Sequence, residues 1–193
     1  MNRLEQLKAH LKPGTVYRRP DLAQWSKSVD RHARELVASG VLQKLQNGLY
    51  YYPKTSVFGP VPADEKQLVK TFLKDDEFLL TSPNAYNMLG VGTTQLYNTR
   101  VVYNHKRHGV YKLGGRTFDF RRKTHFPKKM TEEFLLVDLM NNLKFLAEDR
   151  QSLREKVRQK AVRVDQKKLR RAVKQYANVG VKHYFNDVLN HVS

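Results

Sequence analysis

The sequence has no cysteine, no long hydrophobic run and half as many acidic as basic residues, and each shortage excludes a class of protein. Without cysteine there is no disulfide framework, zinc ribbon or thiolate nucleophile. No apolar run approaches the ~18 residues that a membrane-spanning helix needs. The opening segment, MNRLEQLKAHLK, lacks the apolar core of a signal peptide. The sequence therefore predicts a soluble, cytoplasmic protein that does not associate with membranes.

Positive charge is the dominant feature of what is present. The 193 residues include 36 Lys and Arg against 18 Asp and Glu, which gives a formal charge of +18 and a pI near 10.1. The excess is uneven: +6 over residues 1–60, +2 over 61–120 and +10 over 121–193. Hydrophobic residues make up 40% of the chain, enough for a packed core at this length. This balance predicts a polyanionic partner and basic surfaces contributed by both ends of the chain.

The first 56 residues predict a winged helix. Helical patterns cover residues 2–12 and 21–25, and a third begins at Ser26 or Ser28, which are candidate caps, and ends at Ser39. The dipeptide Asn47-Gly48 between two alternating segments predicts a β-hairpin with a type I′ turn, which needs positive φ at both positions. Three helices followed by a hairpin is the element order of a winged helix-turn-helix.

The rest of the chain predicts a second, mixed domain over residues 63–193, so that the fold class is α+β. The segment TSVFGPVP is expected to be a boundary because of its prolines and glycine. Helices are expected at 64–74 and 82–90, from a cap at Thr131 to Ala147, and over the remainder, with a break and a new cap at Asp165 and a further break at 178–180. Strands are expected at 77–81, 97–103, 110–113 and 116–120. The strands predict a small antiparallel sheet, followed by basic C-terminal helices.

The third helix carries the first candidate site. Val29, Ala33, Leu36 and Val37 form one apolar stripe that is expected to face the core. The opposite side presents cations that can enter a major groove and contact bases or phosphates. With the hairpin included, the predicted DNA-binding residues are Lys27, Ser28, Arg31, Arg34, Lys44, Gln46 and Asn47. The alternative is an ordinary solvated helix face.

A second basic surface is predicted near the C-terminus. From Arg150 to Lys174 the chain has eleven basic and two acidic residues, with Leu153, Val157 and Ala161 at helical spacing. The residues assigned to this surface are Arg154, Arg158, Lys167, Lys168, Arg170, Arg171 and Lys174. The sequence is compatible with two functions of this surface, which are binding to nucleic acid and docking on an acidic protein.

Signatures of catalysis are weak. The triplet Asp75-Asp76-Glu77 is better explained as a solvated turn than as a Mg²⁺ site. His105 and His108 lie in a Lys/Arg-rich turn that repels metal ions. There is no phosphate-binding glycine loop followed by lysine. We therefore expect no catalytic residues, no metal and no cofactor, and a protein that is not an enzyme.

Several short segments resemble the antitoxins of the AbiEi type, which belong to type IV toxin–antitoxin (abortive infection) systems. The resemblance is carried by Gly14-Thr15-Val16-Tyr17, by Asp21-Leu22, by Ser28-Val29-Asp30-Arg31 and by Leu36 to Gly40 with Asn47-Gly48-Leu49-Tyr50. More loosely, the segment from Ser82 to Gly90 is similar to a helix of that family's second domain, and the region from Val164 to Asn190 to its closing helices.

Membership of that family implies two activities. The winged helix represses the protein's own operon by binding inverted repeats in the promoter, and the C-terminal domain counteracts a cognate nucleotidyltransferase-like toxin. An inverted repeat also predicts two copies of the protein per operator. The alternatives are a protein-interaction module that docks on an acidic partner without binding DNA, and an RNA-binding accessory protein.

Overall fold

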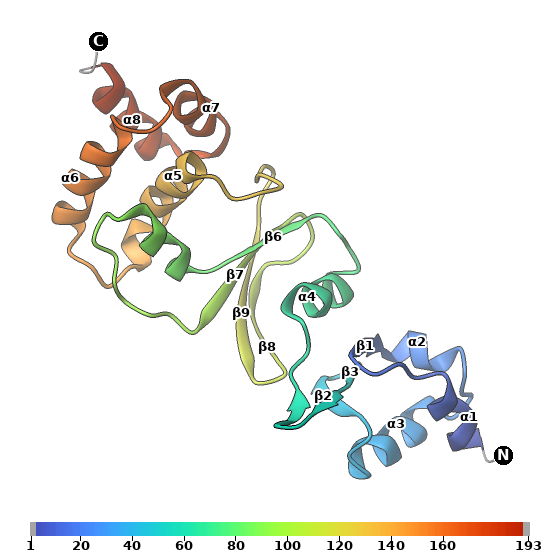
Figure 1. Cartoon of the computed structure of the whole chain (residues 1–193). Coiled ribbons are helices and arrows are strands. Elements are labelled where there is room, and N and C mark those ends of the chain that lie inside the picture. The colour runs from blue at the N-terminus through green and yellow to red at the C-terminus, as the bar shows by residue number, and fades with distance from the viewer. Residues whose placement is uncertain (1–2, 191–193) are drawn as a thin grey trace. The chain divides into compact units, whose positions relative to one another are not determined.

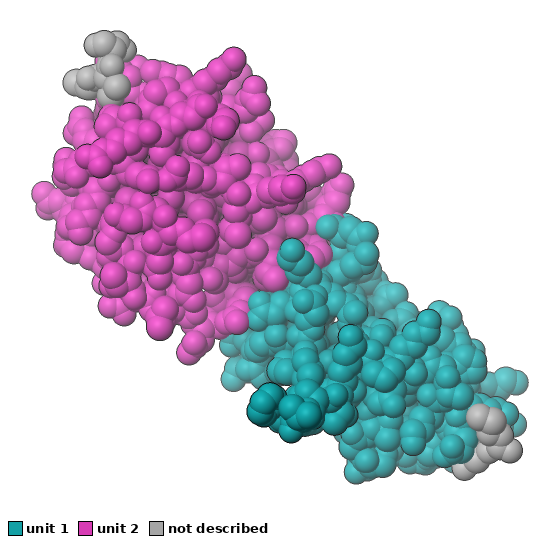
Figure 2. All heavy atoms as spheres, in the orientation of Figure 1, with its two compact units in different colours: residues 1–76, 110–118 teal, residues 77–109, 119–193 magenta. Residues whose placement is uncertain are grey.

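The computed structural model describes residues 3–190, in two compact units. Unit 1 comprises the chain up to Asp76 together with residues 110–118, and unit 2 comprises residues 77–109 and the chain from Asp119 on (Figure 2). The boundary that the sequence predicts between residues 56 and 63 lies inside unit 1.

Unit 1 contains four helices: α1 (Arg3–Ala9), α2 (Arg19–Ala23), α3 (Val29–Ala38) and α4 (Glu65–Leu73) (Figure 1). Asn2, where the first helix was expected to start, lies outside the described residues. The prediction for α2 was wrong by two residues at each end. The helix begins earlier because the Arg18 backbone N–H donates to the Asp21 carboxylate at 2.8 Å, and Pro20 lies in its first turn.

A three-stranded antiparallel sheet packs with these helices. Its strands are β1 (Thr15–Arg18), β2 (Gln43–Gln46) and β3 (Leu49–Tyr52), in the order β1-β3-β2. The hairpin at Asn47-Gly48 is present, but the type I′ prediction was wrong because Gly48 has φ +72° and Asn47 does not have positive φ. The strand register shifts between Lys44 and Gln46, and this irregularity gives the turn a different geometry from that of a regular hairpin.

The segment expected to be a boundary is instead a second hairpin. Strands β4 (Lys54–Ser56) and β5 (Gly59–Val61) pair antiparallel. The hydroxyl of buried Tyr51 donates to the Val61 carbonyl at 2.8 Å and fixes β5 to the neighbouring sheet. The glycine and prolines that suggested a boundary here are compatible with short exposed edge strands as well as with linkers.

The core of unit 1 brings the elements around α3 together. Leu7, Leu22 and Leu36 are fully or almost fully buried in one cluster with Val29 and Ala33 of the predicted apolar stripe. This confirms the predicted inner face of the third helix, except that Val37 is only partly buried.

Unit 2 is built around α5 (Glu132–Asn142), which is buried on nearly every side. It packs against α6 (Arg150–Ala161), α7 (Gln166–Tyr176), α8 (Val179–Asn190) and the 3₁₀ segment η1 (Pro83–Leu89) (Figure 1). The Thr131 and Asp165 side chains accept from backbone N–H groups at the starts of α5 and α7, which confirms both predicted caps. The helix predicted at 82–90 is present as the 3₁₀ segment η1, with Ser82 and Gly90 at its two ends. The helix from Thr131 was predicted to reach Ala147, but α5 ends at Asn142 and is followed by the short 3₁₀ turn η2 (Leu143–Phe145).

The remaining strands form a four-stranded sheet. They are β6 (Phe78–Thr81), β7 (Thr99–Asn104), β8 (Gly109–Leu113) and β9 (Arg116–Arg122), in the order β6-β7-β9-β8. The molecule is therefore a mixed α+β protein with small sheets and C-terminal helices, as the sequence predicts.

Candidate nucleic-acid interface

The outer face of α3 carries exposed cations. Lys27 and Ser28 lie in the turn that precedes the helix, and Arg31 and Arg34 lie on it. Lys27, Arg31 and Arg34 are all exposed, with 64% of the Arg31 side chain open to solvent, and Ser28 is partly buried. The structure thus places the cationic residues predicted for this face on the surface, opposite the buried stripe of Val29, Ala33 and Leu36.

The start of α3 is held by a buried polar contact that sequence reasoning missed. The Ser26 hydroxyl and the Nδ1 atom of buried His32 are hydrogen-bonded at 2.8 Å, and the Ser28 N–H donates to Ser26 Oγ at 3.2 Å. Ser28 is at the N-cap position but makes no side-chain cap bond, so neither candidate serine caps as predicted. Ser26 orders the turn instead.

Arg19 is a second residue that the sequence prediction missed. From α2 its guanidinium donates to both carboxylate oxygens of Asp30 on α3, at 2.7 and 2.6 Å. These bonds lower the pKa of the Asp30 carboxyl and raise that of Arg19. The only sequence signal was the pair Arg18-Arg19 before Pro20, which does not identify Asp30 as a partner. This bidentate pair links α2 to α3 at the surface of the unit.

Glu35 partly neutralises this face, and a backbone carbonyl holds Arg34. Arg31 Nε lies 3.7 Å from Glu35 Oε1 one turn along, and Arg34 Nε donates to the Asp30 carbonyl at 3.2 Å. An exposed pair such as Arg31–Glu35 is worth at most about 1 kcal/mol. The Arg31 guanidinium can therefore leave Glu35 for a stronger anion.

The hairpin residues of the predicted site belong to the same unit. Lys44 and Asn47 are exposed, and Gln46 is partly buried. The Arg19 N–H donates to the Gly48 carbonyl at 2.8 Å, so the turn is fixed against the beginning of α2. Arg19, the first residue of α2, therefore connects the three parts of the site. Its backbone N–H bonds to the β2–β3 turn, and its side chain bonds to Asp30 on α3.

The second basic surface is divided between two places. Arg154 and Arg158 line a groove of about 620 Å³ between α6 and α8, together with His183 and Tyr184. The Arg154 guanidinium lies over the Tyr184 ring, 4.9 Å from its centroid. The other five residues (Lys167, Lys168, Arg170, Arg171 and Lys174) are exposed on α7. Of these, Arg170 donates to the Leu189 carbonyl at 3.1 Å, and Arg170 and Lys174 line a smaller groove of about 300 Å³ against α8.

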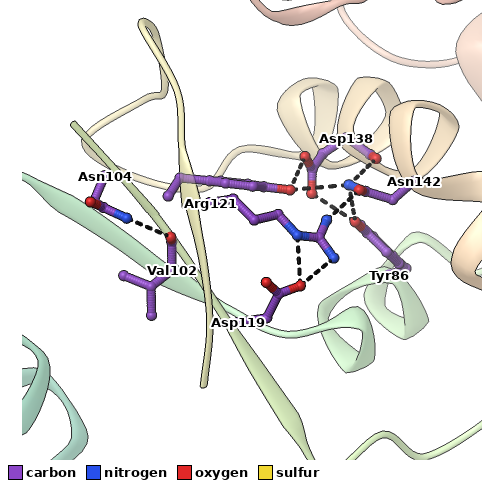
Figure 3. Close-up of polar contacts among 8 residues, drawn as sticks. Tyr86, Val102, Asn104, Asp119, Arg121, Asp138 and Asn142 are labelled. Carbon is purple, nitrogen blue, oxygen red and sulfur yellow. Dashed lines mark hydrogen bonds and ion pairs between the residues drawn. The ribbon is translucent and has the colours of Figure 1, made fainter. Parts of the chain in front are cut away.

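Unit 2 also contains a buried polar cluster that the sequence did not predict (Figure 3). Asp138 of α5 is 1% exposed, and it accepts hydrogen bonds from the hydroxyls of Tyr86 at 2.7 Å and Tyr103 at 2.6 Å. The Asn142 amide donates to both hydroxyls, and the Arg121 guanidinium donates to the Asn142 carbonyl oxygen at 2.6 Å.

Burial controls the protonation of this cluster. It raises the pKa of the Asp138 carboxyl, although the two tyrosines and the nearby cations oppose the change. It also raises the pKa of both tyrosine hydroxyls. The carboxylate oxygens and hydroxyls are all used in bonds to one another, so the cluster stabilises α5 against η1 and β7 and offers no open ligand position.

Comparisons with known proteins support the fold and no more. No protein-family model and no curated protein matches the chain. The chain is similar to the crystal structure of the Rv2827c protein from Mycobacterium tuberculosis, with a TM-score of 0.58 and 15% sequence identity over 98% of this chain and 75% of that one. At this identity the similarity defines a shared mixed α+β architecture.

Within residues 3–190, no helix has both the length and the apolar character that are needed to cross a membrane.

Proposed function

We propose that this protein binds double-stranded DNA in a sequence-specific way, with α3 in the major groove and the Asn47-Gly48 turn at the adjacent backbone. The observation that carries the proposal is the exposed cationic face of α3, held in place by Arg19–Asp30 and Ser26–His32. A helix whose inner face is packed and whose outer face presents arginines meets the requirement for reading base edges.

The order of elements in unit 1 also supports the proposal. The sequence of elements is α1-β1-α2-α3-β2-β3 with sheet order β1-β3-β2. This is the arrangement expected of a winged helix, in which α2 and α3 form the helix-turn-helix and the β2–β3 turn forms the wing. The wing here is short, because only Asn47 and Gly48 separate β2 from β3, and its turn is bonded to Arg19.

The resemblance to AbiEi-type antitoxins supplies the biological role in this proposal. The protein represses its own operon by binding inverted repeats in the promoter, with two copies per operator. It also acts as the antitoxin of a nucleotidyltransferase-like toxin, through surfaces of the C-terminal helices. The proposal contains no catalytic step and needs no cofactor.

Quantitative binding to the DNA upstream of its own gene, and to a random duplex of equal length, tests the proposal. We expect log K to fall linearly with log salt, by about 0.9 per phosphate neutralised. Arg31→Ala is expected to weaken binding to the upstream DNA by about tenfold or more and binding to the random duplex much less.

The matched control is Lys66→Ala, which removes one exposed positive charge from α4 of the same unit. It is expected to change both affinities slightly and equally. Wild-type binding that is independent of salt, or no binding to either duplex, contradicts the proposal.

A further inference from the structure

The tip of the β4–β5 hairpin presents two adjacent apolar side chains entirely to solvent. Val57 is 93% exposed and Phe58 is 98% exposed, the two highest values among the exposed large hydrophobic residues described. Single exposed hydrophobic residues are common on protein surfaces. A neighbouring pair with an aromatic ring at the tip of a hairpin is a more specific arrangement.

This tip is held in a defined conformation. The Ser56 hydroxyl donates to the Gly59 carbonyl at 2.9 Å and accepts from the Phe58 N–H at 3.2 Å. Gly59 has φ +103°, a conformation that other residues rarely adopt. At its base the hairpin is fixed through the bond from Tyr51 to Val61. The turn thus holds Phe58 out from the surface on an anchored support; Figure 1 shows this hairpin, in the colour of residues 54–61, projecting beyond β2 and β3.

The tip is too small for a protein interface, and the net positive charge of unit 1 suits an anionic partner. Two side chains are far smaller than the roughly 800 Å² per partner of a standard protein interface, which argues against a second copy of this chain. The strand that leads to the tip is exposed and polar, with Lys54, Thr55 and Ser56. Unit 1 as a whole carries 15 basic and 8 acidic residues.

We infer that Val57 and Phe58 form a wedge that inserts from the minor groove between two base pairs of the duplex bound by α3. Apolar side chains of this kind unstack a base step and bend the DNA. The inference rests on the proposed DNA binding and adds a second contact to it. The strength of this second contact depends on how easily the DNA bends at the site, and not on hydrogen bonds to base edges. Flexible pyrimidine–purine steps are therefore the preferred point of insertion.

The length of the chain between the two hairpins limits how far along the DNA the wedge can insert from the β2–β3 turn. Between Leu49, beside the Asn47-Gly48 turn, and Val57 there are eight residue steps, which span at most about 29 Å when fully extended. One turn of duplex is about 34 Å long. The bent step therefore lies within one helical turn of the backbone contact made by the β2–β3 turn.

The test compares DNA bending by full-length wild type and Phe58→Ala on circularly permuted fragments of the protein's own upstream DNA, with 2-aminopurine fluorescence as a measure of unstacking. Wild type is expected to bend the fragment and increase the fluorescence. Phe58→Ala is expected to lose most of both signals and to bind about tenfold more weakly. Phe58→Leu keeps an apolar wedge and is expected to retain most of the bend.

Leu96→Ala is the matched control, because Leu96 is an 84% exposed hydrophobic residue of unit 2. It is expected to leave binding and bending unchanged. If wild type binds but leaves the duplex straight, or if Phe58→Ala bends it equally, the wedge is refuted while DNA binding stands. If wild type binds no duplex, both proposals fail. A change in sedimentation of Phe58→Ala without a change in bending assigns the tip to contact between copies and refutes the wedge.

Discussion

At the scale of single residues, buried polar groups are the features that sequence patterns do not reveal. Asp138 lies in the run FLLVDLM, where every neighbour is apolar, and its two hydroxyl partners come from 35 and 52 positions away. His32 lies on the packed side of α3, beside residues assigned to the core. A periodic pattern identifies the inner face of a helix, but a polar partner for that face is set by tertiary structure.

Replacing Asp138 by Asn tests the cluster. The hydroxyls of Tyr86 and Tyr103 donate to different oxygens of Asp138, and in asparagine one of these two positions becomes an NH₂ donor, so one buried hydroxyl loses its acceptor. We expect Asp138→Asn to lower the free energy of unfolding at pH 7 by about 1–3 kcal/mol. Urea unfolding measures this change, and Glu5→Gln, an exposed carboxyl of α1, serves as the control.

The pH dependence of the same variant gives the sign of the pKa shift. The folded pKa of Asp138 is raised above its ordinary value of 3.8, so the folded state binds more protons than the unfolded state between the two values. The stability of wild type relative to Asp138→Asn should therefore fall as pH rises from about 3.8 to the raised pKa, and stay constant above it. A relative stability that rises with pH over this interval contradicts the raised pKa.

At the scale of elements, the apolar stripe and the caps were predictable because they depend on local spacing. The inner face of α3 and the capping by Thr131 and Asp165 follow from residues within one or two turns. The β4–β5 hairpin and the negative φ of Asn47 were not predictable, since they depend on pairing geometry and on a tertiary bond from Tyr51. The sequence therefore predicts most helices, and fewer of the turns between strands.

The pair Arg19–Asp30 gives a prediction at this scale. Asp30→Asn removes the negative partner of Arg19, which leaves the guanidinium free to contact phosphate and loosens α2 against α3. We expect tighter binding to random duplex, with the salt slope steeper by about 0.9, and a smaller preference for the upstream DNA. Titration of both duplexes at several salt concentrations measures these quantities. Unchanged slope and preference would show that the pair has no part in positioning α3.

At the scale of the whole molecule, the charge is distributed over both units. Unit 1 has 15 basic and 8 acidic residues, and unit 2 has 21 and 10. Sequence alone predicted two basic surfaces, but not that the second is divided between the α6–α8 groove and α7. The assignment of residues 110–118 to unit 1 was also not predictable, because it depends on tertiary contacts such as the bond from Arg116 to the Ala63 carbonyl.

Removing positive charge from α7 distinguishes the two possible roles of its cations, which are DNA binding and docking on an acidic protein. Lys167, Lys168 and Arg171 are exposed, and alanine at all three removes three charges without disturbing the bond of Arg170 to Leu189. If α7 contacts DNA non-specifically, the triple variant should bind both duplexes more weakly to the same degree, with the salt slope reduced by up to about 2.7. An unchanged slope, together with loss of toxin neutralisation, assigns α7 to a protein partner.

The central claim is that the exposed face of α3 occupies a major groove, and methylation protection of guanine N7 tests it most directly. On the protein's own upstream DNA, we expect wild type to protect guanines in two clusters about 10 base pairs apart, one for each copy. Arg31→Ala should lose this protection even at concentrations that restore binding. Saturated binding by wild type with every guanine N7 still reactive would contradict the account.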